Sequence, residues 1–290
     1  MHILCINKPY DLEGEDEFMT KETKKTIWDK RPTYIILGWL LILAAIACDV
    51  GITVPRYEFV TDKVSKDTRI VLLTDFHSSS YGANQQVLID AVEKQQPDAI
   101  LLCGDILEDV RPHEHSIELL SQLGEKYPCY YTTGNHEEWS GEVDNIKEIV
   151  RECGVKVMEG GCVDFSGIRV CGADNSLPAN QYSNCVNAAD KGLFTIMMSH
   201  RPDRVNMYSG NGFDLVVCGH AHGGQIIVPY FLNGLYAPDQ GVFPDYAGGR
   251  YTIADGTTEM VVSRGLCKNQ LPRVFNQPEV VVIDIVAENE

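Results

Sequence analysis

Short apolar runs alternate with amphipathic stretches from residue 69 to the end of this 290-residue chain. The runs are typical of buried strands; they read RIVLLT, DAILLC, CYYTT, LFTIMMS, DLVVC, EMVVS and EVVVIDIV. Between them, apolar residues recur at helical spacing in NQQVLIDAVEKQ, SIELLSQLGEKY and VDNIKEIVREC. This alternation predicts an α/β domain with buried strands over residues 68–290.

The chain before this domain follows a different pattern. Residues 1–32 are polar, acidic at first and basic from Lys21 to Arg31, and we interpret them as a leader. The apolar run YIILGWLLILAAIAC follows, and a helix of that length would span about 22 Å. Continued to Val54, it would approach the ~30 Å hydrocarbon core of a membrane. We therefore expect a membrane anchor or signal segment over 33–54 and a polar linker over 55–67.

Three interpretations of segment 33–54 stay open. It could be an uncleaved anchor with its basic flank inside and the catalytic domain outside. It could be a cleaved signal, because Ala45-Ile46-Ala47 fits the small-residue cleavage pattern. The run AAIAC also resembles a bacterial lipoprotein signal with Cys48 as the lipidated residue. The last two would need a shorter leader, which a start at Met19 would supply. A buried core helix is disfavoured by the basic flank and the lack of amphipathicity. The sequence thus predicts membrane attachment, with an extracytoplasmic domain.

Charge and cysteine content narrow the choice of partners. The formal net charge is −17, which disfavours nucleic acid as a partner. An acidic protein can still bind phosphate where metal cations invert the local field. The chain has ten cysteines; no CxxC pair indicates a zinc site, and Cys153, Cys162 and Cys171 could hold a disulfide.

Five of the apolar runs end in metal-ligand residue types. These residues are Asp75 and His77, Asp105, Asn135 followed by His136, His200, and His220 with His222. Carboxyl ends of strands form the rim at which α/β sheets bind ligands. Glycines precede three of the groups (Gly104, Gly134 and Gly219), so the backbone can approach the site closely.

The donor types indicate two divalent ions. Carboxylates neutralise charge and can bridge two ions, while neutral imidazoles suit borderline transition metals. No thiolate belongs to the set, which disfavours a structural zinc site. We expect Mn, Fe, Zn or Co, with Mn²⁺ the first choice for activity in vitro.

The series DFH, GDILE, GNHE, SH and GHAHGGQ resembles the signature of the calcineurin-like metallophosphoesterases, over about residues 68–287. The GHAHGGQ block and the closing SRGL…NQPEVVVIDI are similar to the YkuE/YaeI-type branch. Members of that branch tend to be membrane-associated, and some act on lipid-linked substrates such as UDP-diacylglucosamine. The resemblance implies a four-layer α/β/β/α sandwich with a dimetal site at one edge of the strands.

The resemblance also implies roles for the candidate residues. The first ion would be held by Asp75, His77 and His222, the second by Asn135, His200 and His220, and Asp105 would bridge both. His136 would face the substrate as general acid or phosphate-binding group. The family's GDxxD element often ends in Asp, whereas Glu108 stands here with Asp109 beside it, so the carboxylate that orients His136 stays open.

These roles predict hydrolysis of a phosphoester or pyrophosphate bond. The substrate could be lipid-linked or part of the cell envelope. A hydroxide that bridges the ions would attack phosphorus in line, and His136 would protonate the leaving group. The alternatives are a non-catalytic metal-binding protein and a dinuclear hydrolase of a non-phosphate bond. His113 and His115 are expected at a solvated helix start, and Arg201 could contact phosphate or pair with Asp203.

Overall fold

The computed structural model describes residues 31–189, 192–253, 256–268 and 272–288. The chain divides into two units, Met1–Ala47 and Cys48–Glu290, which we describe separately. The predicted leader, residues 1–32, lies almost wholly outside the described residues.

The described part of the first unit is the helix α2, Arg31–Ala47. It contains the expected apolar run except for its last residue, Cys48, where the chain turns. The helix therefore ends seven residues before Val54. Thr53 bridges to Glu279, and its amide donates to the carbonyl of Pro278. Among the described residues, no helix has both the length and the apolar character required to cross a membrane. The predicted transmembrane helix over 33–54 is therefore not supported.

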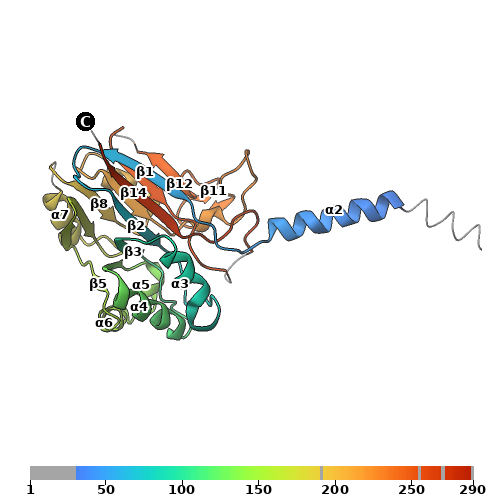
Figure 1. The fold of residues 1–290 in the computed structure, drawn as a ribbon, viewed down its shortest axis with the longest axis horizontal. Helices are drawn as coiled ribbons and strands as arrows, with labels where there is room; N and C mark the ends of the chain where they lie inside the picture. Colours follow the sequence, from blue (N-terminus) through green and yellow to red (C-terminus); the bar gives the residue numbers. More distant parts are fainter. Residues whose placement is uncertain (1–30, 190–191, 254–255, 269–271, 289–290) are drawn as a thin grey trace, which may run out of the picture. The chain divides into compact units, whose positions relative to one another are not determined.

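The second unit contains a first six-stranded sheet in the order β1-β14-β2-β3-β4-β5 (Figure 1). Its strands are β1 (Arg56–Thr61), β2 (Thr68–Leu73), β3 (Ala99–Cys103), β4 (Cys129–Thr132), β5 (Lys156–Val157) and β14 (Val281–Ala287). Strands β2 to β5 are parallel, and β14 runs antiparallel to β2. The carboxyl ends of β2, β3 and β4 therefore meet at one edge of this sheet.

A second six-stranded sheet has the order β12-β13-β9-β8-β7-β6. Its strands are β6 (Cys162–Phe165), β7 (Ile168–Gly172), β8 (Phe194–Met198), β9 (Leu215–Cys218), β12 (Gly249–Thr252) and β13 (Glu259–Val262). Strands β7, β8, β9 and β13 are parallel, and β6 and β12 run antiparallel at the two edges. A small hairpin of β10 (Tyr236–Ala237) and β11 (Gly241–Val242) stands apart from both sheets.

Alternation along the strands builds separate apolar cores. In β2, Ile70 and Leu72 face the second sheet, while Val71 and Leu73 face helices, as a strand's period of two requires. The helices over the first sheet are α3 (Gln86–Glu93), α4 (Glu114–Lys126) and α6 (Val143–Glu152), which Figure 1 shows grouped beneath β2 and β3. The outer face of the second sheet packs on α7 (Ala179–Ala188) and α8 (Val205–Tyr208).

The predicted mixed α/β fold is confirmed, with all seven predicted strands and all three predicted helices present. The segment expected as a linker, 55–67, is different. It contains β1, which pairs in parallel with β14 along its whole length. Only Phe59 of this strand is buried, because β1 lies at the sheet edge, and so its sequence lacks the continuous apolar run of the central strands.

One of the disulfides considered from the sequence is present. Cys162 and Cys171 are cross-strand partners in the β6–β7 pair and are bonded to each other. Cys153 is a free, half-buried thiol, and Cys103 and Cys218 are buried thiols in β3 and β9, as expected for small core residues.

Candidate metal centre

The predicted ligands lie at the carboxyl ends of five strands drawn from both sheets. Asp75 and His77 follow β2, Asp105 follows β3, and Asn135 begins the short helix α5 (Asn135–Trp139) after β4. From the second sheet, His200 follows β8, while His220 and His222 follow β9. All seven side chains are buried. The two sheets thus bring residues up to 147 positions apart to one interior site.

The backbone at this site is strained. Five of the seven predicted ligands have a positive φ: Asp75 (51°), His77 (49°), Asp105 (53°), His220 (67°) and His222 (48°). Such angles are uncommon for residues with a side chain and persist where the surroundings fix them. Backbone hydrogen bonds do so here, because Asp75 and His77 donate their amides to the carbonyls of Gly104 and Asp105, at 3.0 and 2.9 Å.

The glycines that precede three ligand groups are required by space. A Cβ at Gly104 would lie 2.3 Å from the His200 ring, and one at Gly134 would lie 2.1 Å from the Asp105 carboxylate. At Gly219 it would lie 2.4 Å from Asp75. Gly265, which sequence reasoning did not single out, has the same role, since its Cβ would lie 2.5 Å from the side chain of Asp75. Each glycine therefore leaves room for a ligand that comes from a different loop.

The ligand atoms converge on a small volume around Asp105. Its Oδ2 lies 3.1 Å from His200 Nε2 and 3.7 Å from His77 Nε2. Asp75 Oδ1 lies 3.6 Å from His222 Nε2 and 3.8 Å from His200 Nε2. Bonds of about 2.0–2.2 Å to a common ion place its ligand atoms at this kind of separation. Three clusters of possible ligands arise among the described residues, and two of them share Asp105: Asp75–His77–Asp105–His222 and Asp105–His200–His220. The third is His77–Glu108–His136.

Unsatisfied polar atoms test whether cations fit these residues. Asp105 Oδ2, Asn135 Oδ1 and His200 Nε2 are buried and have no hydrogen-bond partner. Leaving such atoms buried and unpaired costs about 1–3 kcal/mol each, more for charged groups. Asp105 Oδ2 and His200 Nε2 lie 3.1 Å apart but are not oriented for a hydrogen bond. This is the orientation expected if both atoms bind one ion. The oxygen and nitrogen donors fit borderline divalent metals.

The pKa values of the buried Asp and His side chains also fit a site for cations. Burial opposes the charged form of His200, but the Asp105 carboxylate outweighs burial and raises the pKa of His200 to about 10. Burial likewise opposes the ionised form of Asp105, yet His200 and His77 hold its pKa well below the usual range. Burial lowers the pKa of His222 to about 3. The site therefore favours an ionised Asp105 carboxylate next to a positive charge. A divalent ion would also supply that charge.

Glu137 holds the loop that carries Asp105. Its buried carboxylate accepts four backbone N–H bonds; the donors are Asp105 (2.9 Å), Ile106 (2.7 Å), Leu107 (3.0 Å) and Gly134 (2.7 Å). Burial and the Asp105 charge raise the pKa of Glu137 to about 7, while the donated N–H bonds oppose that shift. The sequence placed Glu137 in the GNHE motif, and the structure adds that it fixes the turns after β3 and β4.

Both carboxylates left open by the sequence contact His136. Nδ1 of His136 lies 2.7 Å from Glu108 Oε1 and 2.8 Å from Asp109 Oδ1. The other Glu108 oxygen lies 2.9 Å from His77 Nδ1, so Glu108 connects His136 to a predicted metal ligand. Burial opposes protonation of His136, but Glu108, Asp105 and Asp109 outweigh it and raise its pKa to about 9. The ring is therefore held with a proton to donate.

Other candidates lie outside the centre. His115 is exposed and pairs with Glu118, as expected of a helix start, whereas His113 is half-buried and contacts the Glu108 carbonyl at 2.9 Å. Arg201 pairs with Asp203, one of its two expected roles. It also pairs with Asp239, which in turn contacts His220 and which nothing in the sequence indicated.

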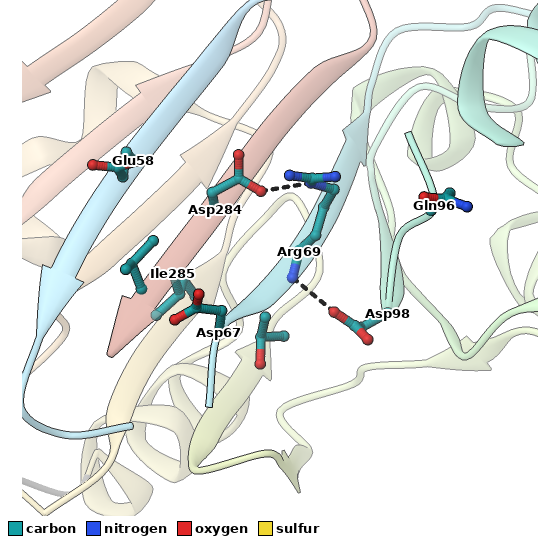
Figure 2. Close-up of a pocket in the computed structure, with 9 residues that line it drawn as sticks. Glu58, Asp67, Arg69, Gln96, Asp98, Asp284 and Ile285 are labelled. Atoms are coloured by element: carbon teal, nitrogen blue, oxygen red, sulfur yellow. Dashed lines mark hydrogen bonds and ion pairs between the residues drawn. The ribbon is translucent and has the colours of Figure 1, made fainter. Parts of the chain in front are cut away.

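A polar hollow of about 470 Å³ lies at the opposite edge of the first sheet, where β2 begins (Figure 2). Arg69 occupies it, with its guanidinium 2.6 Å from Asp284 and its amide 2.8 Å from Asp98. Figure 2 shows both contacts as dashed lines. None of the predicted site residues lines this hollow, and its Arg69 is paired with Asp284.

The geometry matches a known family. The model of the calcineurin-like phosphoesterases matches residues 68–224, just over half of the chain. The chain belongs to this family. The match begins at β2 and ends with the turn that carries His222, so it includes every predicted ligand. Family and geometry together make the protein a metallophosphoesterase with a buried Asp/His cluster that can bind a divalent metal.

Similar proteins include members of the branch suggested by the sequence. The Bacillus subtilis protein named "Uncharacterized metallophosphoesterase YkuE" is 28% identical, over 76% of this chain and 80% of its own length. The Escherichia coli "Phosphodiesterase YaeI" is 28% identical, over 80% of this chain and 86% of its own. A Bos taurus "Transmembrane protein with metallophosphoesterase domain" is 25% identical over 76% of this chain, which spans about half (53%) of that protein.

Proposed function

We propose that this protein hydrolyses phosphodiester or related phosphoester and pyrophosphate bonds with two divalent ions. The observation that carries the proposal is the convergence of buried, unpaired Asp105 Oδ2, Asn135 Oδ1 and His200 Nε2 at the shared edge of two sheets. Divalent cations would satisfy an inward-facing set of this composition. The name of the similar phosphodiesterase YaeI supports the same reaction class.

The seven ligands divide naturally between two ions. We assign Asp75, His77 and His222 to the first ion and Asn135, His200 and His220 to the second, with Asp105 shared. The two residue clusters that meet at Asp105 support this division. The ions, when bound, would supply an activated water and neutralise charge on the phosphoryl oxygens.

His136 donates the proton in this proposal. Its Nδ1 is held by Glu108 and Asp109, so Nε2 is the atom that would protonate the departing oxygen. The side chain is 17% exposed, in contrast to the fully buried ligands, and can therefore reach a substrate. The exposed Trp139 ring lies beside it, with ring centroids 5.0 Å apart, and would border the leaving group.

Membrane attachment and a lipid-linked or cell-envelope substrate are the finer part of the proposal. The apolar α2, the basic residues before it and the name of the bovine relative support attachment. Two exposed aromatic side chains after the last ligands, Tyr230 and Phe231, are also suited to a lipid interface. The Cys162–Cys171 disulfide supports an oxidising, extracytoplasmic compartment. The three separate apolar cores support a four-layer α/β/β/α arrangement.

A substrate screen tests the reaction class. Metal-stripped protein would be supplied with Mn²⁺ and assayed on bis-p-nitrophenyl phosphate, nucleotide diphosphate–lipids, phospholipids and a nitroanilide. We expect Mn²⁺-dependent hydrolysis of phosphoesters and no turnover of the amide. Hydrolysis of the amide alone would make the protein a dinuclear hydrolase of another bond, and metal binding without any turnover would make it a binding protein.

A reporter fusion tests the topology. A reporter placed after Glu290 should be active outside the cytoplasm of a bacterial host, because the basic residues before α2 stay inside. A cytoplasmic signal from the same fusion would contradict the extracytoplasmic assignment while leaving the reaction untouched.

A further inference from the structure

We propose that Asp239 is a positioning residue, which fixes the imidazole of His220 so that its Nδ1 faces the second metal ion. The inference rests on the proposed two-ion site. Asp239 Oδ2 lies 2.8 Å from His220 Nε2. Asp239 belongs to the turn between β10 and β11, 19 residues beyond the ligand that it contacts. This turn therefore returns to the metal centre after the last ligand of the chain.

The hydrogen bond determines which nitrogen is free. A carboxylate can only accept here, so the proton of the neutral ring must sit on Nε2, and the lone pair is left on Nδ1. A carboxylate on the non-ligating nitrogen also raises the basicity of the imidazole and fixes its orientation. The side chain of His220 is 3% exposed and that of Asp239 is 45% exposed, so this hydrogen bond joins a buried ring to a carboxylate at the surface.

The same arrangement occurs at two of the other three histidines assigned to the ions, His77 and His200. His77 Nδ1 is 2.9 Å from Glu108, which leaves Nε2 directed at Asp105. His200 Nδ1 is 2.9 Å from the Cys103 carbonyl, which again leaves Nε2 directed at Asp105. In both cases one ring nitrogen has a protein acceptor and the other faces the cluster. Asp239 extends this pattern to His220, where Nε2 has the protein acceptor and Nδ1 is the nitrogen left for the ion.

Asp239 is itself held in place by Arg201. The Arg201 Nη2 atom lies 2.8 Å from the same Oδ2, and its Nε lies 2.9 Å from Asp203. Because Arg201 directly follows His200, this ion pair joins the loop after β8 to the turn that supports His220. Asp239 thus contacts His220 and, next to His200, Arg201. The residues of the first ion are joined to His220 by a different contact, because the backbone N–H of His220 donates to the Asp75 carboxylate. The effect of losing Asp239 should fall on the second ion.

Calorimetric titration of the metal-stripped full chain with Mn²⁺ tests this. We expect Asp239→Ala to weaken one of the two binding steps about 10–100-fold and to leave the other step unchanged. Asp239→Asn should lose less, because its amide oxygen can still accept the Nε2 proton. Arg201→Gln should also lose less, since it leaves the Asp239–His220 contact in place. The matched control is Asp245→Ala, which removes an exposed acid from the same segment.

Two further measurements separate positioning from a structural role. The melting temperature of the metal-stripped Asp239→Ala protein should equal that of wild type. In the Zn²⁺-loaded protein, long-range ¹H–¹⁵N spectra should show His220 protonated on Nε2 in wild type, and that proton should lose its hydrogen-bonded shift in Asp239→Ala.

Four results would overturn the inference. Asp239→Ala could bind both ions like Asp245→Ala, weaken both steps equally, or lower the melting temperature without metal. Arg201→Gln could weaken Mn²⁺ binding as much as Asp239→Ala does, which would assign the effect to the arginine.

Results on the wild-type protein distinguish this inference from the proposed function. If wild type binds two ions but hydrolyses no phosphoester, the proposed reaction is wrong. If wild type binds fewer than two ions, both the proposed function and the inference on Asp239 are wrong.

Discussion

Glu108 Oε1 lies 2.7 Å from Nδ1 of His136, and this contact connects the proposed proton donor to the metal centre. The second oxygen of the same carboxylate contacts His77, a proposed ligand of the first ion. Glu108 is 2% exposed, so these bonds are shielded from water. One buried carboxylate thereby sets the orientation of two rings with different tasks.

Replacing Glu108 should therefore damage both tasks. In Glu108→Gln the amide NH₂ must face one of the two ring nitrogens: His77 would then lose its carboxylate acceptor, and His136 would keep only Asp109. We expect kcat to fall about 10–100-fold and Mn²⁺ affinity to fall with it. Asp109→Asn is the matched control, because Asp109 contacts only His136 of the two rings. Equal losses of metal affinity in the two variants would contradict the bridging role of Glu108.

The general-acid role of His136 predicts a dependence on the leaving group. His136→Asn cannot donate a proton, and proton donation contributes about 10²–10⁴-fold where the leaving group is poor. Hydrolysis of an alkyl phosphodiester should fall by about that factor, and hydrolysis of a nitrophenyl ester far less. Metal content, measured by elemental analysis, should stay near wild type. If both esters lose activity alike, His136 binds phosphate or packs beside Asn135 instead, and loss of metal would make it a ligand.

Asp105 should be the least replaceable ligand. It is the residue common to the clusters of the two proposed ions, so Asp105→Asn weakens charge neutralisation at two ions, whereas Asn135→Ala removes one neutral ligand. We expect Asp105→Asn to reduce metal content and kcat/KM more than Asn135→Ala does. Elemental analysis and kinetics on the two purified variants decide the point. Similar or reversed losses would argue against the shared position of Asp105.

The glycine before Asn135 allows a purely steric test. Gly134 has a φ of −105°, which any residue can adopt, but a Cβ there would lie 2.1 Å from the Asp105 carboxylate. Gly134→Ala should destabilise the fold by about 1–3 kcal/mol and impair Mn²⁺ binding. Gly161→Ala, where the added Cβ meets open space, is the control. Denaturant unfolding and Mn²⁺ titration measure the two effects; a Gly134→Ala protein that matches the control would show that the loops can move apart.

The central strands and the candidate residues at their ends could be predicted from sequence because each is local. A buried parallel strand is a continuous apolar run, and the polar residue at its end, such as Asp75 after β2, needs no knowledge of distant contacts. β1 escaped prediction because it is an edge strand in which only Phe59 is buried, and its other five residues are exposed or half-buried. The end of α2 was also missed, because Thr53 leaves the helical pattern to pair with a segment more than 200 residues away.

Several contacts between distant loops could not be predicted from the sequence. Asp239 reaches His220 only because the chain after β9 folds back through the β10–β11 hairpin, and a PDQG turn is ordinary in composition. The double contact of Glu108 with His77 and His136 likewise depends on side-chain positions from three loops. The Asp239–His220 and Glu108–His77 contacts have no spacing that a motif could encode, whereas the Glu108–His136 contact was one of the two alternatives that the GDILE motif left open.

The most direct test of the two-ion account is a titration of metal-stripped protein with Mn²⁺, with binding and hydrolysis of bis-p-nitrophenyl phosphate followed together. The account predicts no turnover before metal is added, full activity only after two ions per chain are bound, and little or no activity in Asp105→Asn at the same concentrations. Full activity of the metal-stripped protein, or two tightly bound ions with no hydrolysis of any phosphoester, would contradict it.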